Sequence, residues 1–216
     1  MSVLVLDNFA ATDGTLLPAH VGDSGGGWSR RSDSDAAGDM VITSNQCQAS
    51  PDSKTEHCLT SVIPATADYT VEATILYVNG VGNQFNTIAG RFSTDGQTGY
   101  SIYFDSNVVS GGRWHLAKTT AGAASDLGTW DALYNPASQH VAQLVMVGTA
   151  ISMTSDGVTQ IGPVTDSTYT AIGRASIGGF GVTSPADEPK FTQFRLLGTS
   201  VTTAPTLYRS ISIRRR

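Results

Sequence analysis

The feature that most constrains this chain is a series of short apolar segments, each soon ended by Gly, Asp, Asn or Pro. In the clearest segment, YTVEATILYV, the side chains of Tyr69, Val71 and Ala73 fall at alternate positions. This two-residue period is typical of a β-strand that buries one face. Residues that favour helices are scarce, since Lys and Glu each occur only three times among 216 residues. The pattern therefore predicts an all-β fold made of many short strands and tight turns.

Segments of this kind recur along most of the chain at the spacing of hairpins. Strands are expected over residues 3–6, 39–44, 58–63, 69–78, 85–92, 100–104, 113–118, 140–147, 150–154, 158–161, 176–182 and 190–197. The three strands between residues 85 and 118 are expected to form an antiparallel meander. Residues 119–139 lack a clear apolar period and are expected to be the longest irregular segment. No linker interrupts the series, so we expect one domain over residues 1–198 and an extended arm over residues 199–216.

The chain is acidic overall, with a net charge of −5, but positive charge gathers at its end. An acidic body argues against general binding of nucleic acids, which requires a basic surface. The C-terminal arm carries Tyr208, Arg209, Arg214, Arg215 and Arg216. This composition predicts an arm that binds an acidic partner surface. The alternative is a solvated terminal tail without a partner.

The first residues, MSVLVLDNF, do not have the charged start of a secretory signal peptide, and their apolar run stops at Asp7. No apolar stretch reaches the ~20 residues that span a membrane as a helix. We therefore expect a protein that is made in the cytosol and does not insert into membranes.

Four stretches together resemble the concanavalin A-like jelly roll of lectins, laminin-G-type modules and tailed-phage virion proteins. They are the opening residues 7–29, the pair 69–78 and 85–104, the hairpin 140–157, and the closing segments 177–182 and 191–197. The resemblance covers most of residues 1–198. It implies a two-sheet antiparallel sandwich with an extended C-terminal arm.

The jelly-roll resemblance also implies a place for the opening segment. The first and last strands of this architecture pair in one sheet, which places Phe9 near Phe194. Trp28 would enter the core between the sheets, where a large aromatic ring buries much apolar surface. Phe9 and Leu16 are expected to anchor the first edge.

No residue of the sequence is assigned a catalytic role. Jelly-roll glucanases carry paired carboxylates on one strand face, whereas Glu72 stands alone in its segment. The histidines at positions 20, 57, 115 and 140 are scattered, and no G-x-S-x-G motif occurs. We therefore do not expect an enzyme, and we interpret each His as structural.

Calcium ligands and a disulfide are the remaining candidates for a cofactor or a cross-link. Asp95 and Asp105 offer carboxylates for Ca²⁺, but they do not have the ordered spacing of a calcium loop. Turn formation explains them equally well, so no cofactor is expected. Cys47 and Cys58 flank a polar segment that is interpreted as a hairpin loop, which would bring the sulfurs into bonding range. Cytosolic synthesis favours free thiols instead.

The segment DLGTWDALYNP holds the candidates for a glycan site. Trp130, Asp131, Tyr134 and Asn135 lie within six residues of one another. In lectins, exposed aromatic rings stack on sugars, while Asp and Asn side chains bind their hydroxyl groups, and such residues often lie on loops. The alternative is that Trp130 and Tyr134 cap the core of the sandwich.

The jelly-roll resemblance, the missing catalytic motif and the basic arm favour a structural protein of a tailed-phage virion. The role would be that of a capsid decoration (cement) protein or a minor head or tail protein, made in the host cytoplasm. It would bind major capsid or tail proteins and further copies of itself on the particle. The alternative is a carbohydrate-binding, lectin-like module for host-surface glycans, and a glycoside hydrolase is the third interpretation.

Overall fold

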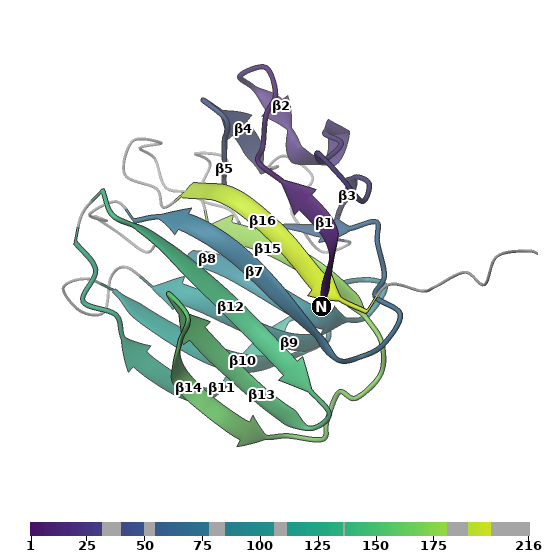
Figure 1. Ribbon diagram of the computed structural model, residues 1–216, viewed down its shortest axis with the longest axis vertical. Helices are drawn as coiled ribbons and strands as arrows, with labels where there is room; N and C mark the ends of the chain where they lie inside the picture. Colours follow the sequence, from purple (N-terminus) through teal and green to yellow (C-terminus); the bar gives the residue numbers. More distant parts are fainter. Residues whose placement is uncertain are drawn as a thin grey trace, which may run out of the picture.

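Two antiparallel β-sheets stacked face to face form the body of the protein (Figure 1). The computed structural model describes residues 1–31, 40–49, 55–77, 85–105, 112–135, 137–180 and 190–199. Within these ranges, no helix is long and apolar enough to cross a membrane. The all-β sandwich predicted from the sequence is confirmed.

Among the described residues, one sheet has nine strands and holds both the first and the last of them. Its main path runs through β14 (Val158–Thr165), β13 (Ala150–Ser155), β12 (Gln139–Val147), β7 (Tyr69–Leu76), β16 (Lys190–Gly198), β5 (Gln46–Gln48), β4 (Val41–Thr43) and β2 (Thr15–Leu16). The remaining strand, β1 (Ser2–Asp7), pairs with β16. A short 3₁₀ helix, η1 (Leu17–Ala19), follows β2.

The second sheet has seven described strands and lies behind the first in Figure 1. Its order is β11 (Ala123–Asp131), β10 (Arg113–Thr120), β9 (Gly99–Asp105), β8 (Phe85–Phe92), β15 (Arg174–Phe180), β6 (Thr55–Thr60) and β3 (Trp28–Arg30). Because β8, β9 and β10 are neighbours in this order, the predicted meander is confirmed.

The first and last strands pair, as the resemblance implies. β1 runs antiparallel to β16, with Asp7 opposite Phe194. Trp28 packs edge-on against Phe194, with the two ring centroids 4.9 Å apart. Phe9 and Trp28 are both buried in the core between the sheets. The opening segment is thus an integral part of the sandwich.

The carboxylate of Asp7 is fully buried beneath this opening segment. The backbone N–H of Phe9 donates to Oδ1 at 2.7 Å, and the indole N–H of Trp28 donates to Oδ2 at 2.8 Å. His20 Nε2 lies 3.0 Å from Oδ1. A buried carboxylate is strongly unfavourable without such partners, so the three contacts hold the opening segment against the core.

The opening edge is anchored one residue later than predicted. Leu16 is 45% exposed in β2, whereas Leu17, the first residue of η1, is fully buried. Leu16 is the last residue of β2, and the chain turns into η1 at Leu17, so the Leu17 side chain enters the core instead.

The two cysteines do not lie on a hairpin. Cys47 belongs to β5 in the nine-stranded sheet, and Cys58 belongs to β6 in the seven-stranded sheet. Both side chains are buried in the core, and no disulfide joins them. Burial, and next the charge of Cys58, raises the pKa of the Cys47 thiol. The predicted hairpin is wrong because the chain crosses from one sheet to the other between these positions.

A strand occupies much of the segment that was expected to be irregular. β11 pairs with β10 along its whole length, with Trp130 opposite Trp114. It is an edge strand whose side chains are mostly exposed, so its sequence carries no apolar period. Backbone hydrogen bonds to β10, rather than burial, define this strand.

The predicted C-terminal arm falls almost entirely outside the described residues. Of residues 199–216, only Thr199 is described. The boundary of the arm and the partner-binding role of its basic residues therefore stay predictions.

Asp166 follows β14 and ties the chain onto the seven-stranded sheet. Its carboxylate accepts hydrogen bonds from the Tyr100 hydroxyl at 2.7 Å and from Lys118 Nζ at 3.1 Å. The backbone N–H of Thr168 donates to it at 2.8 Å. Burial by itself would raise the pKa of Asp166, but the hydrogen bonds outweigh this effect and hold the pKa well below its usual range.

We expect Asp7→Asn to lower the free energy of unfolding by about 2–3 kcal/mol, because the amide leaves a buried donor without an acceptor. Urea denaturation of the variant and the wild type measures this loss. Asp131→Asn is the matched control, since it removes the same charge from an exposed ion pair with Arg113 and should change stability little. Equal losses in both variants would contradict the role given to Asp7.

The lowered pKa of Asp166 makes part of the stability depend on pH. Folding favours the ionised form, so this contribution is complete above the pKa of an unfolded Asp, about 3.9, and is lost as the pH falls towards the folded pKa. Asp166→Asn should reduce the free energy of unfolding at pH 7 and flatten its decline between about pH 4.5 and 2.5. Urea denaturation across this range tests the prediction, and identical slopes for variant and wild type would contradict it.

Candidate functional site

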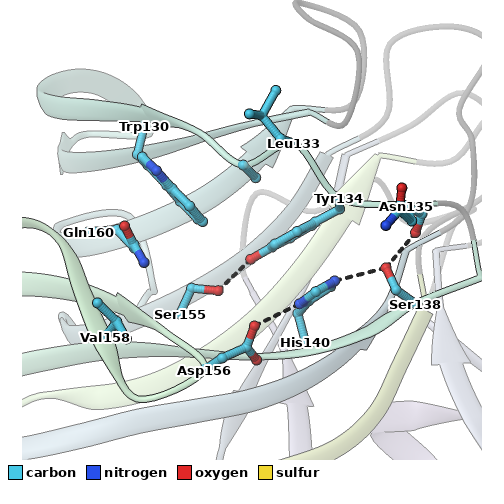
Figure 2. Close-up of a pocket in the computed structure, with 11 residues that line it drawn as sticks. Trp130, Leu133, Tyr134, Asn135, Ser138, His140, Ser155, Asp156, Val158 and Gln160 are labelled. Atoms are coloured by element: carbon cyan, nitrogen blue, oxygen red, sulfur yellow. Dashed lines mark hydrogen bonds and ion pairs between the residues drawn. The ribbon is translucent and has the colours of Figure 1, made fainter.

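The candidate site lies at the side of the sandwich, where the edge strands of the two sheets approach each other. β11 ends the seven-stranded sheet, and β14 ends the nine-stranded sheet. A Cβ at Gly128 of β11 would lie only 2.6 Å from Ile161 Cγ2 of β14, so glycine allows this approach. The segment after β11 thereby comes next to the turn that joins β13 to β14 (Figure 2).

A cavity of about 350 Å³ opens at this place, within the size range of small-molecule sites. It is lined by Trp130, Ala132, Leu133, Tyr134, Asn135, Ser138, His140, Ser155, Asp156, Val158 and Gln160 (Figure 2). Its rim carries two exposed apolar side chains, Leu133 at 74% and Val158 at 59% exposure. The walls thus combine aromatic, apolar and polar groups from both sheets.

The structure brings three of the four predicted glycan residues to this cavity. Trp130, Tyr134 and Asn135 line it, whereas Asp131 does not. Arg113 Nε donates to Asp131 Oδ1 at 2.6 Å in an exposed ion pair, and this hydrogen bond lowers the pKa of Asp131. Trp130 and Asp131 point to opposite faces because they are neighbours on a strand.

Tyr134 caps the core of the sandwich and also positions His140 at the cavity. Its ring is 8% exposed and stacks on the imidazole of His140, with the centroids 3.6 Å apart and the planes 5° from parallel. The Trp114 indole N–H donates to the Tyr134 hydroxyl at 3.1 Å, and this hydroxyl shares a hydrogen bond with Ser155 Oγ. Burial raises the pKa of Tyr134. For this residue the geometry agrees with the alternative of a core cap.

Trp130 keeps a partly exposed ring at the cavity. It meets Tyr134 edge-on, with the centroids 6.0 Å apart. Gln160 and Val158 of β14 lie on the same side of the cavity as the indole (Figure 2). The indole is therefore the aromatic wall that a bound molecule can reach.

Polar groups of β12 and the β13–β14 turn form the opposite wall. His140 Nδ1 lies 2.7 Å from Asp156 Oδ2, and His140 Nε2 lies 2.8 Å from Ser138 Oγ. The backbone N–H of Val141 donates to Asp156 Oδ1 at 2.9 Å. These contacts fix both the ring and the carboxylate.

Sequence reasoning missed Ser138, His140 and Asp156 as site residues. Pairing of β12 with β13 places Ala142 opposite Ser155, so the next residues outward, Val141 and Asp156, also meet. The signal was the Gly-Thr pair at 148–149, which lies between two apolar segments, is typical of a two-residue hairpin turn and so predicts this pairing. His140 was interpreted as structural because the four histidines are scattered along the sequence.

A second hollow lies on the outer face of the seven-stranded sheet. Two adjoining cavities of about 190 and 120 Å³ share Thr55, His57, Thr87, Tyr103 and Ala124. The Tyr103 ring stacks on His115, with the centroids 4.4 Å apart, and its hydroxyl donates to Asp126. Burial, and next the hydrogen bond to Asp126, raises the pKa of Tyr103. Burial, with nearby Arg31, lowers the pKa of His57 to about 3.

The two calcium candidates do not lie together. Asp95 lies in the turn before β9 and accepts hydrogen bonds from Ser93 Oγ and from the backbone N–H of Gln97. Asp105 ends β9, whose seven residues extend over about 20 Å. In the part of the chain that the structure describes, no three His, Cys, Asp or Glu side chains gather as metal ligands. Asp95 and Asp105 therefore do not share one site, and the expectation that no cofactor is bound stays a prediction.

Comparison with known proteins gives similarity at the level of the fold. The chain matches no family model and no curated protein sequence. The carbohydrate-binding module CBM66 from Bacillus subtilis aligns with a TM-score of 0.60 at 18% identity, over 79% of this chain and 92% of that one. The exoplasmic/lumenal domain of VIP36, in its Ca²⁺/Man2-bound form, aligns with a TM-score of 0.60 at 14% identity, over 89% and 90%. The potassium-bound Emp46p carbohydrate recognition domain gives 0.57 at 9%, over 80% and 89%.

We expect Tyr134→Ala to lower the free energy of unfolding by about 3–5 kcal/mol, because a buried aromatic side chain is lost. Tyr134→Phe keeps the ring on His140 and leaves the Trp114 indole N–H without its acceptor, so the expected loss is about 1–3 kcal/mol. Urea denaturation compares the two variants. Equal stability of wild type and Tyr134→Phe would contradict the hydrogen bonds assigned to the Tyr134 hydroxyl.

Proposed function

We propose that this protein binds carbohydrate in the cavity between Trp130 and Asp156. The observation that carries the proposal is the position of a partly exposed indole opposite a wall of fixed polar groups, in a cavity of ligand size. Sugar binding uses both an aromatic surface and polar groups, because one face of a pyranose ring is largely apolar and its edge carries hydroxyl groups. Few convergent polar groups beside an apolar wall are typical of small-molecule sites.

The polar groups have the chemistry to bind sugar hydroxyls. Asp156 offers carboxylate oxygens, and Asn135 and Gln160 offer both amide donors and acceptors. Because the turn and the strand ends already hold Asp156 and His140, little conformational entropy is lost when a ligand binds.

The charge of the cavity favours neutral sugars over acidic ones. Asp156 is the one carboxylate among the described residues that line it, and none of them is Lys or Arg. A sugar carboxylate placed here would meet the charge of Asp156 without a fixed cation to offset it. We therefore assign the site to neutral saccharides.

The fold neighbours support the same class of ligand. They include a carbohydrate-binding module, a carbohydrate recognition domain, and a domain crystallised with Ca²⁺ and Man2. Their identity to this chain is too low to transfer a sugar or a residue, so the support concerns only the class of ligand.

The role in a phage virion stays a prediction. The basic residues on which partner binding depends lie outside the described part of the chain. A virion protein can carry a carbohydrate-binding domain, so the two roles are compatible. A location on the particle, self-association and binding to capsid or tail proteins are proposals that follow from the sequence resemblance.

An array of neutral and acidic oligosaccharides, probed with the full chain, tests the proposal, and titration calorimetry of the neutral hits gives their affinity. Trp130→Ala should weaken binding at least tenfold, since a central Trp in a binding site contributes about 2 kcal/mol or more. Absence of binding to every neutral saccharide would overturn the proposed function.

Tyr103→Ala is the matched control, because it removes an aromatic ring from the hollow on the outer face of the seven-stranded sheet. We expect this variant to bind as the wild type does. Loss of binding in Tyr103→Ala, with Trp130→Ala unaffected, would move the site to that hollow.

Addition of EDTA to the same titration tests whether Ca²⁺ contributes to saccharide binding.

A further inference from the structure

Three residues of the cavity wall also form a chain of hydrogen-bonded groups with a known catalytic order. Ser138 Oγ lies 2.8 Å from His140 Nε2, and His140 Nδ1 lies 2.7 Å from Asp156 Oδ2 (Figure 2). This is the order in which a base activates a serine while a carboxylate orients the base. We propose that Ser138 is a nucleophile toward carboxylic esters, with His140 as general base and Asp156 as the positioning residue.

The imidazole is held on its face as well as at both nitrogens. The Tyr134 ring covers one face of His140 at a centroid distance of 3.6 Å. Asp156 accepts the Val141 N–H through Oδ1, and its own backbone N–H donates to the Val141 carbonyl oxygen at 2.8 Å. A base fixed in this way stays aligned with its serine, which is the geometric requirement for general-base catalysis.

The proton of Ser138 has two acceptors within reach. Oγ also contacts the backbone carbonyl oxygen of Asn135. The ionised carboxylate of Asp156 accepts from Nδ1–H, so a neutral His140 ring presents a bare Nε2 to Ser138. Rotation about the Cβ–Oγ bond turns the hydroxyl proton from the carbonyl to Nε2, and the serine is then ready to attack.

The reaction assigned to the cluster is a two-step acyl transfer. Ser138 Oγ bonds to the ester carbonyl carbon while its proton passes to His140 Nε2. The bond from that carbon to the alcohol oxygen then breaks, and the alcohol leaves with the proton. Water, deprotonated by the same Nε2, attacks the acyl-serine, releases the carboxylic acid and restores Ser138.

The negative charge that forms on the carbonyl oxygen needs a donor. The backbone N–H of Ser138 already bonds to the Asn135 carbonyl oxygen at 3.1 Å. The side-chain amide of Asn135 lies beside Ser138 in the cavity, and we assign it as the donor (Figure 2). A single donor stabilises the intermediate less than two do, so slow turnover is expected.

The cavity also indicates the class of ester. At about 350 Å³ it is large enough for a sugar ring with a short acyl group. The substrate would be a carbohydrate hydroxyl esterified with a small acid such as acetate, and this assignment rests on the proposed function. The nucleophilic role of Ser138 does not rest on the proposed function.

A fluorophosphonate probe, followed by mass spectrometry of the labelled full chain, tests the nucleophile directly. We expect one adduct at Ser138, absent from Ser138→Ala and formed at least tenfold more slowly in Asp156→Asn, since loss of the orienting carboxylate impairs the base. Ser125→Ala removes an exposed serine of β11 and should label as the wild type does. An unlabelled Ser138 in the folded wild type would overturn the proposal.

A gain-of-function pair keeps the test independent of folding defects. Ser138→Cys should react with iodoacetamide at least tenfold faster than Ser125→Cys, because a neighbouring imidazole favours the thiolate. Peptide mapping separates these thiols from Cys47 and Cys58, which are buried. Equal rates for the two introduced thiols would overturn the assigned role of His140.

The two proposals fail in different ways. The fluorophosphonate carries no sugar, so it reports on Ser138 whether or not the cavity binds carbohydrate. Labelling at Ser138 in a protein that binds no saccharide would support the nucleophile and overturn the sugar ester as its substrate. Saccharide binding without labelling would overturn the esterase alone.

Discussion

The buried carboxylate of Asp7 is the contact on which the arrangement of the two sheets depends. Its hydrogen-bond partners are Phe9, two residues after β1, His20 just after η1, and Trp28 of β3. β1 is paired with β16 in one sheet, and β3 is paired with β6 in the other. The Asp7 carboxylate therefore has all its hydrogen bonds only when both sheets and the opening segment are in place. Packing of the apolar core around it is thus coupled to the hydrogen bonds of one buried polar group.

Much of the fold could be predicted because burial imposes a visible period. The strand β7 and the meander from β8 to β10 have one face in the core, so their apolar residues alternate. These strands could therefore be predicted from the sequence. The strand β11 could not be predicted from the sequence, because an exposed edge strand is defined by its backbone hydrogen bonds. The positions of Cys47 and Cys58 in different sheets could not be read either, since a local pattern does not say whether a chain turns back or crosses over.

The site was partly predictable for the same reason. Trp130 and Asn135 stand out in a polar segment, and the structure places both at the cavity. Asp131 is their neighbour in sequence but faces the other side of the strand, where it pairs with Arg113. Ser138, His140 and Asp156 meet only through the register of β12 with β13. Composition carries no information on such a register, although the Gly148-Thr149 turn between the two strands does.

The meeting of β11 and β14 at Gly128 has a thermodynamic consequence for any molecule that occupies the cavity. Trp130 belongs to one sheet, whereas His140 and Asp156 belong to the other sheet and the turn at its edge. A ligand in contact with both walls therefore contacts both sheets at once. Its binding free energy is then added to the free energy that keeps the layers together, so occupancy and cohesion of the sandwich are linked quantities.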